Sequence, residues 1–309
     1  MRLPIVFTLA FCASGSAQTI AITGGTVYPV SGPRIENATV LIQNGRITAV
    51  GTNVQVPADA RRIDARGKWV TPGLINAATQ MGLTEIGAVQ GTNEGVESEN
   101  DVSAAFNVLE GINPASQLIP VTRVEGITTA VAGPGGGLIA GQAVAINLLG
   151  DRIEDLTVKS PVAMVAAINE FAKSAGGGSR AGVMARFRRV LNDAREYDRR
   201  RTDYQRDQMQ DLAAPAADLE ALLPVLRGEL PVMIQANRRS DIENALRLAR
   251  EYNLKLVLTG AAEGWQVADQ IAAARGPVVI DPRVNIPTYD ALSPRLDNAA
   301  LLARGGATV

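Results

Sequence analysis

The side chains that could do chemistry in this 309-residue chain are mainly carboxylates and amides, because the chain contains no histidine and a single cysteine. Imidazole is the commonest ligand of transition metals and the usual general base near neutral pH. Histidine-containing zinc sites, the Ser-His-Asp triad and the Cys-His dyad are therefore excluded, and one cysteine excludes a Cys₄ zinc site. A hydrolytic site in this chain would have to be built from carboxylates and amides.

Three local features could form sites. Glu170 and Glu263 are carboxylates that could do acid–base work, but no spacing shows the pair about 5 Å apart that a retaining glycosidase needs, which favours surface or capping roles. The glycine-rich residues 133–142 could cradle an anion with backbone N–H groups, yet they lack the Lys-Ser/Thr of a Walker A loop and favour a loop between strands. The run Arg199–Arg201 lies among acidic residues, which is typical of a solvated helix.

Composition limits the partners. The net charge is −1, so there is no basic excess to pair with nucleic-acid phosphates, and the aromatic content of 4% argues against a surface that stacks bases or sugars. A hydrophobic content of 46% is enough for a large core, in one large domain or two smaller ones. Beyond the N-terminus, no apolar run is long enough to span a bilayer.

Residues 1–17 are typical of a secretory signal peptide. Arg2 precedes an apolar run from Leu3 to Ala13, and small residues follow, which predicts cleavage after Ala17. The alternative is a buried N-terminal strand or helix. Cleavage would remove Cys12, leaving no disulfide and no thiol chemistry. We therefore expect an exported protein, periplasmic or secreted.

The elements that must position any site change character near residue 70. Residues 18–70 read as short strands and turns, with a hairpin joined at Asn44-Gly45. From residue 71 onward, apolar strands alternate with helices, which predicts a parallel α/β barrel. Residues 160–173 are predicted as a helix capped by Ser160, and residues 240–253 as a helix capped by Ser240 or Asp241. Residues 307–309 are expected to begin a strand, which indicates a fragment or an open barrel.

From residue 19 to 309, the chain resembles the amidohydrolase superfamily, especially its imidazolonepropionase-like and exported amidohydrolase branches. Residues 63–83, IDARGKWVTPGLINAATQMGL, are similar to the family's stretch ending in Pro-Gly-Leu-Ile-Asp-x-His-x-His-x-Gly, and residues 125–150, 231–258 and 295–309 also match its usual run. The resemblance implies a TIM-barrel (β/α)₈ fold with a composite β-sandwich. Residues 18–70 would be the N-terminal part of the sandwich, and residues 71–309 a barrel whose C-terminal part is missing.

The resemblance also places the family's metal ligands. The two histidines of the family's first barrel strand match Ala78 and Gln80, and the Asp that precedes them matches Asn76. A later His-Ala-His-like stretch matches residues 235–237, which are Gln235, Ala236 and Asn237. A last histidine matches Gly260. Alanine and glycine have no donor, and neutral amides are weak ligands for zinc. Without a metal, water keeps a pKa of about 15.7. No cofactor is therefore expected, although the family would use zinc or a similar divalent ion.

The resemblance leaves several functions open. The expected pocket, for a small neutral polar ligand, is lined by Asn76, Gln80, Gln235, Asn237 and Glu263; the alternative is a relaxed former site with solvated amides. The family hydrolyses non-peptide C–N bonds with a metal. This chain is interpreted as an inactive homologue, that is, a pseudoenzyme. It would bind a ligand or act as the partner subunit of an active paralogue. Its assembly would be a homo-oligomer or a complex with that paralogue. The alternatives are an active hydrolase with an atypical site and a structural relic without a ligand.

Overall fold

The computed structural model describes residues 19–283 and 286–309. The chain divides into two compact units, one ending at Gly73 and one running from Leu74 to Val309. The sequence places a boundary between residues 70 and 71. The signal peptide predicted over residues 1–17 lies outside the described residues.

The N-terminal unit is a five-stranded sheet. Its strands run in the order β3-β2-β1-β4, and β5 pairs with the far end of β1. Asn44 and Gly45 join β2 to β3 with φ angles of 52° and 72°, the left-handed conformation that a two-residue hairpin turn requires, so the predicted hairpin is confirmed. The strands are β1 (Ile20–Val27), β2 (Ile35–Gln43), β3 (Arg46–Gly51), β4 (Arg61–Asp64) and β5 (Trp69–Val70).

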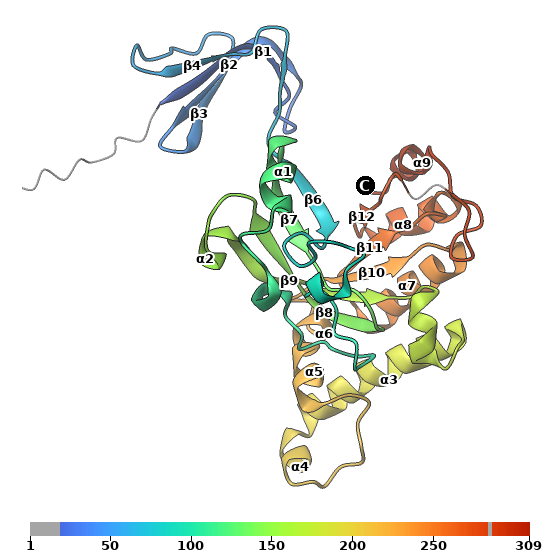
Figure 1. The fold of residues 1–309 in the computed structure, drawn as a ribbon. Helices are drawn as coiled ribbons and strands as arrows, with labels where there is room; N and C mark the ends of the chain where they lie inside the picture. Colours follow the sequence, from blue (N-terminus) through green and yellow to red (C-terminus); the bar gives the residue numbers. More distant parts are fainter. Residues whose placement is uncertain (1–18, 284–285) are drawn as a thin grey trace, which may run out of the picture. The chain divides into compact units, whose positions relative to one another are not determined.

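The C-terminal unit is built on a curved seven-stranded sheet, in the order β12-β11-β10-β9-β8-β7-β6 (Figure 1). Neighbouring strands are parallel except at β8, which is antiparallel to both β7 and β9. The predicted α/β barrel with a separate β-sheet is confirmed as an architecture, but β8 breaks the regular repeat of an eightfold (β/α) barrel. The strands are β6 (Leu74–Thr79), β7 (Ile127–Ala132), β8 (Ile139–Asn147), β9 (Thr157–Ala167), β10 (Val232–Ala236), β11 (Leu256–Gly260) and β12 (Val278–Val279).

Strand β9 occupies most of the stretch predicted as a helix from Ser160, so that prediction was wrong. Its apolar residues from position 161 to 167 are buried or half-buried on both faces, and such a continuous apolar run cannot be assigned to helix or strand by periodicity alone. Pro161 lies where the pairing with β8 shifts register, between the pairs Ala143–Ala163 and Ala145–Lys159. A proline is tolerated at such an irregularity because no ladder hydrogen bond depends on its missing N–H.

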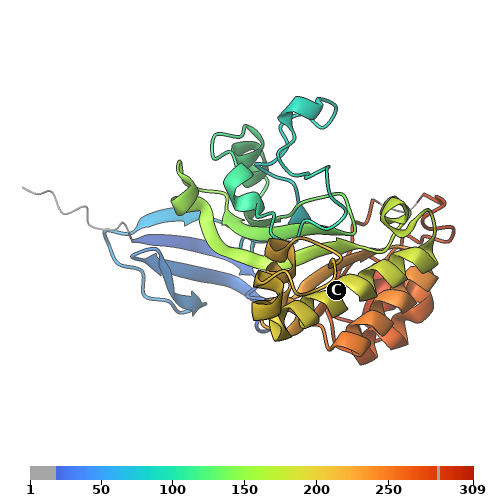
Figure 2. The ribbon, with the colours of Figure 1, turned by 90° about the horizontal axis from the view of Figure 1, so that it is seen from below.

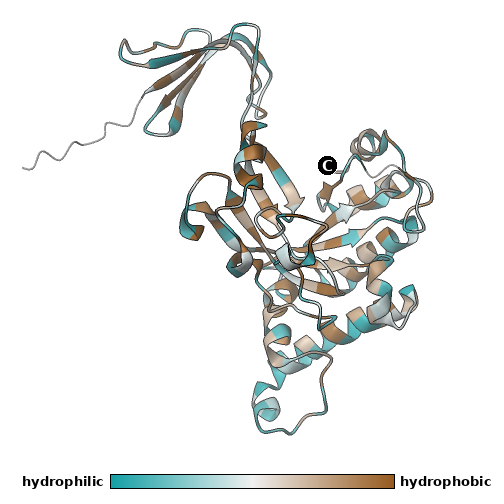
Figure 3. Ribbon diagram, in the orientation of Figure 1, coloured by the Kyte–Doolittle hydropathy of each residue, from teal (hydrophilic) through white to brown (hydrophobic). Residues whose placement is uncertain are grey.

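The longest helices pack on one side of this sheet. Figure 2 shows the yellow-to-orange helices along one side and the teal segment before α1 along the other. Phe187, Val190 and Leu191 of α3 belong to the largest buried apolar cluster, together with Ile234 of β10. Figure 3 shows the hydrophilic residues of α3 in teal among the apolar ones. The helices are α1 (Leu118–Val124), α2 (Ile153–Leu156), α3 (Arg180–Arg199), α4 (Arg201–Gln205), α5 (Ala216–Ala221), α6 (Leu223–Leu226), α7 (Arg239–Tyr252), α8 (Ala268–Ala274) and α9 (Asn298–Arg304).

Two remaining predictions concern the ends of elements. Residues 307–309 do not form the strand expected there, although the Thr308 carbonyl accepts a hydrogen bond from the Val278 N–H at 2.8 Å. Within the described part of the chain, none of the helices is long and apolar enough to cross a bilayer.

Candidate functional site

The candidate site lies at the carboxyl ends of β9, β10 and β11. The parallel register places Gln235 of β10 between Ala167 of β9 and Thr259 of β11, and Ala236 beside Gly260. In α/β barrels and sheets, ligands bind at this end of the strands because the loops that follow them converge there. Residues that follow these strands are therefore placed to form one site.

Gln235 is held by an amide from the end of the neighbouring strand. The side-chain amide of Asn169 donates from Nδ2 to Gln235 Oε1 at 2.9 Å, and Asn169 Oδ1 accepts from the Ala172 N–H at 3.0 Å. Asn169 is buried, whereas Gln235 is exposed between the buried residues Ile234 and Ala236. One face of β10 is thus open at Gln235, with its amide oxygen already paired.

Asn237 and Gly260 fit together. Asn237 Nδ2 donates to Asp290 Oδ2 at 2.9 Å, while its Oδ1 is buried and has no hydrogen-bond partner. Gly260 has a φ of +84°, and a Cβ added there would lie 2.3 Å from Asn237 Oδ1, far inside contact distance. The Asn237 amide therefore occupies the space that any side chain at position 260 would need.

Arg180, at the start of α3, joins carboxylates from three segments. Its Nε donates to Asp241 of α7 at 2.8 Å, its Nη1 lies 3.1 Å from Glu170, and its Nη2 lies 3.3 Å from Asp290 in the segment after β12. The Asp241 side chain is fully buried, and its Oδ1 has no hydrogen-bond partner. Burial raises the pKa of Asp241, and the bond from Arg180 opposes this rise without cancelling it.

This arrangement corrects the capping role that the sequence gave to Asp241 and shows the partners of Glu170. Asp241 lies in the first turn of α7 and pairs with Arg180. Arg238 occupies the N-cap position and makes no side-chain cap bond, so the predicted cap at Ser240 or Asp241 was wrong. Glu170 occupies the N-cap position of a short 3₁₀ helix, Phe171–Gly176, without a side-chain cap bond. Its side chain is 39% exposed and pairs with Lys173 at 2.7 Å as well as with Arg180. The Lys173 hydrogen bond, with the charge of Arg180, lowers the pKa of Glu170.

Glu263, one of the predicted pocket residues, turns its carboxylate to the backbone. It is buried and accepts from the N–H groups of Arg239 at 2.8 Å, Leu292 at 2.6 Å and Ser293 at 2.9 Å. Three backbone donors satisfy much of the acceptor capacity of a carboxylate. Glu263 therefore ties the start of α7 to the segment after β12.

Asn76 and Gln80 are held by other neighbours. Asn76 Oδ1 accepts from the Ala78 N–H at 3.2 Å. Gln80 Nε2 lies over two glycines, 3.1 Å from a Cβ built on Gly95 and 3.2 Å from one on Gly135. Within the described residues, no hydrogen bond links these two side chains to Gln235, Asn237 or Glu263. The structure thus brings the β10 and β11 candidates together and gives the β6 candidates separate contacts.

Sequence reasoning missed three residues of this cluster: Asn169, Arg180 and Asp290. Asn169 had a signal, because it directly follows the apolar run of β9; reading that run as a strand would have placed it at a carboxyl end. Asp290 lies in a turn-rich segment without hydrophobic periodicity, and Arg180 follows three glycines and a serine. Neither residue type nor spacing marks these two as partners.

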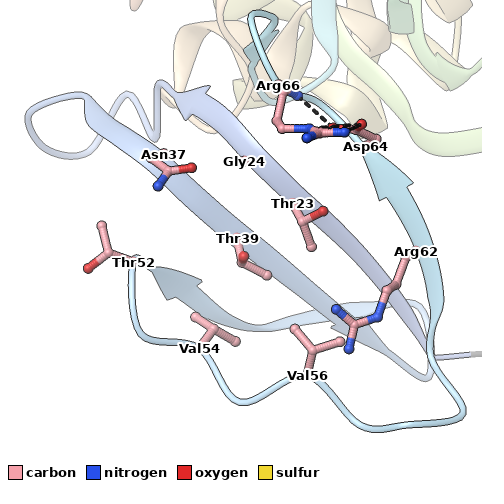
Figure 4. A pocket seen from close by; sticks show the side chains of 10 residues that line it. All are labelled: Thr23, Gly24, Asn37, Thr39, Thr52, Val54, Val56, Arg62, Asp64 and Arg66. Carbon is pink, nitrogen blue, oxygen red and sulfur yellow. Dashed lines mark hydrogen bonds and ion pairs between the residues drawn. The ribbon is translucent and has the colours of Figure 1, made fainter.

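A separate open groove lies on the N-terminal sheet (Figure 4). Arg66 Nη2 and Asp64 Oδ2 pair at 2.6 Å, and the hydrogen bond from the Arg66 side chain lowers the pKa of Asp64 to about 2. A carboxylate so strongly held in its ionised form is a poor general acid or base near neutral pH. The groove is lined by Thr23, Gly24, Asn37, Thr39, Thr52, Val54, Val56, Arg62, Asp64 and Arg66.

Comparison with solved structures decides the family. The structure of an amidohydrolase from Thermotoga maritima MSB8 matches 93% of this chain and 76% of its own, with a TM-score of 0.83 and 26% sequence identity. The chain belongs to the amidohydrolase superfamily. No family model matches the sequence.

Curated relatives agree with this assignment over limited parts of their length. Amidohydrolase tasK of Hapsidospora irregularis is 24% identical over 246 residues, which cover 70% of this chain and 25% of tasK. A 5-methylthioadenosine/S-adenosylhomocysteine deaminase of Symbiobacterium thermophilum is 41% identical over 71 residues, which cover 22% of this chain and 16% of the deaminase. The chain thus spans a quarter or less of the length of these curated relatives.

The residues present do not fit the divalent metal that the superfamily implies. The matched positions hold Ala78, Gln80, Gln235, Asn237 and Gly260, which offer neutral amide oxygens or no donor at all. The amide oxygen of Gln235 is already bonded to Asn169, and that of Asn237 lies against Gly260. Across residues 19–283 and 286–309, no three His, Cys, Asp or Glu side chains form a group that could hold a metal ion.

Proposed function

We propose that this chain is a non-catalytic member of the amidohydrolase superfamily that binds a small polar molecule at the carboxyl ends of β9, β10 and β11. The observation that carries the proposal is the fit of Asn237 into the space above Gly260. These positions match two histidines of the family, and here one residue fills the place that a side chain at the other would need. Restoring a single histidine would therefore not rebuild a pair of ligands.

The chemistry of the remaining groups supports the loss of hydrolysis. Attack on an amide carbonyl needs an activated water, and no imidazole is present to accept its proton. The carboxylates of this region are already engaged: Asp241, Asp290 and Glu170 with Arg180, and Glu263 with three backbone N–H groups. A general base needs a free acceptor aimed at a water or substrate, and the unpartnered Oδ1 of Asp241 belongs to a fully buried side chain.

Two features support binding. Gln235 is exposed on a strand whose neighbouring residues are buried, so a polar amide faces an open space at the strand ends. Asn237 keeps a buried oxygen without a partner, and a ligand donor or a water would relieve the cost of leaving it unpaired. Export to the periplasm and association with an active paralogue stay predictions.

A hydrolysis assay tests this proposal. We expect no turnover of N-acyl amino acids or lactams above background, with or without added zinc, and the same background from the double variant Gln235→Ala/Asn237→Ala, because these amides do no chemistry. If the wild-type protein and the double variant show the same residual rate of hydrolysis, that rate comes from a contaminating enzyme. Turnover by the wild-type protein that the double variant loses would contradict the proposal, since it would place a working active site at these strand ends.

A further inference from the structure

The carboxylate of Asp290 is bound by donors from three separate elements. Asn237 Nδ2, at the end of β10, donates to Oδ2 at 2.9 Å. The Glu170 backbone N–H, after β9, donates to Oδ1 at 2.9 Å, and Arg180 Nη2, at the start of α3, donates to the same oxygen at 3.3 Å. A guanidinium, an amide N–H and a backbone N–H converging on one carboxylate form a carboxylate-binding site.

Asp290 belongs to a segment, residues 286–296, that we call the strap. Polar anchors hold the strap to the strand ends: Glu263 accepts from Leu292 and Ser293, and Trp265 Nε1 donates to the Ser293 carbonyl at 2.9 Å. Tyr289 of the strap is 85% exposed, whereas the Asp290 side chain is 16% exposed. The strap thus presents its large apolar side chains outward and inserts a carboxylate among the three donors.

We propose that these donors form the binding site for the carboxylate group of a small ligand, and that Asp290 occupies the site as an internal substitute until the ligand displaces it. This inference rests on the proposed function, because it names the class of ligand that the non-catalytic site takes. Binding the ligand carboxylate replaces each hydrogen bond of Asp290 with one of the same kind. The exchange therefore needs no new charge partner in the protein.

The surrounding charges restrict the ligand to a single negative charge. The cations Arg180 and Lys173 already face Glu170 and Asp241, which stay in place when Asp290 leaves. A dianion such as a phosphate monoester would lie beside these two carboxylates and be repelled, whereas a monocarboxylate restores the charge that Asp290 supplied. We expect carboxylates to bind in preference to phosphates and to neutral carboxamides.

Trp265 gives a direct readout of the exchange, because its hydrogen bond to Ser293 breaks when the strap moves. The experiment uses the full chain with Trp69→Phe, so that Trp265 is the only tryptophan. Its fluorescence is titrated with butanoate and, as the neutral control, with butanamide. We expect a saturable change with butanoate only, and an affinity about tenfold higher in Asp290→Ala because the internal competitor is gone. Adding Asn237→Ala to Asp290→Ala should lower that affinity about tenfold, because the ligand alone then loses the Asn237 donor.

Asp290→Asn serves as a second variant if Asp290→Ala does not fold, because it keeps the shape and lacks the charge. Absence of a carboxylate-selective signal in both wild type and variant would overturn the inference. Binding to the Asp290 variants alone would also overturn it, because Asp290 would then be a permanent structural filler. Ammonia release from butanamide would contradict the proposed function instead, and would leave the butanoate titration readable.

Discussion

Replacing Arg180 by methionine is expected to lower the free energy of unfolding by about 3–5 kcal/mol, the range for breaking a buried ion pair at one partner. Asp241 is fully buried and Arg180 is its charged partner at 2.8 Å, so the variant leaves a carboxylate without compensation. Urea denaturation measures the loss. The matched control is Arg283→Met, which removes an exposed pair with Asp281 and should leave the unfolding midpoint unchanged.

The loss of unfolding free energy in Arg180→Met should grow as the pH rises. Burial raises the pKa of Asp241, and the variant removes the hydrogen bond and charge of Arg180 that lower it. A folded-state pKa raised above the unfolded value, about 3.9 for Asp, gives stability that is full below the unfolded pKa and is lost as pH rises through the folded pKa. The deficit should therefore be larger at pH 8 than at pH 5. Adding Asp241→Asn should abolish this difference, and a deficit independent of pH would refute the assignment.

The second large effect is expected at Gly260. Gly260→Ala should lower the free energy of unfolding by about 2–3 kcal/mol. About 1–2 kcal/mol comes from placing a non-glycine residue in the left-handed conformation. About 1 kcal/mol comes from displacing Asn237 and breaking its hydrogen bond to Asp290. Gly228→Ala is the matched control: its φ is +69°, but a Cβ there would approach only Lys255 Cε, at 3.8 Å. Urea denaturation should show the smaller, backbone cost alone at Gly228.

Asn237 should account for the difference in stability cost between Gly260→Ala and Gly228→Ala. In an Asn237→Ala background the steric part of the Gly260→Ala cost disappears, because no amide lies above the α-carbon. The double-mutant cycle should then give a coupling of about 1 kcal/mol between positions 237 and 260. Strict additivity of the two substitutions would mean that the side chains at positions 237 and 260 do not compete for this space. It would contradict the proposal that Asn237 prevents a side chain at position 260.

The sequence predicted those parts of the fold that have strong local signals. Asn44-Gly45 specified a hairpin by turn chemistry, and the runs at β10 and β11 were short, apolar and followed by amphipathic helices. Strand β9 was misread because an apolar run carrying Ser160-Pro161 also has the features of a helix start. Burial on both faces, which only the assembled sheet provides, decides between the two.

The residues of the candidate site could be predicted only at positions that match motifs of the family. Positions Gln235, Asn237 and Gly260 followed from matched motifs, and the structure places Gln235 and Asn237 on β10 with Gly260 beside them on β11. The partners of these residues depend on tertiary contacts across more than fifty residues of chain, as for Asn237 with Asp290 and Asn169 with Gln235. No local pattern encodes such pairs. The role of Asp241 was misassigned for the same reason, since a helix-start Asp usually caps.

We propose that packing and hydrogen bonds among the protein's own side chains stand where the superfamily's metal ligands would lie. The most direct test of this proposal is the metal content of the purified chain after equilibration with zinc and removal of free ion, measured by mass spectrometry. The account predicts no stoichiometric zinc in the wild-type protein and the same trace level in Gln235→Ala/Asn237→Ala. About one tightly bound zinc ion per chain, lost in that double variant, would contradict it, because these amides would then be ligands.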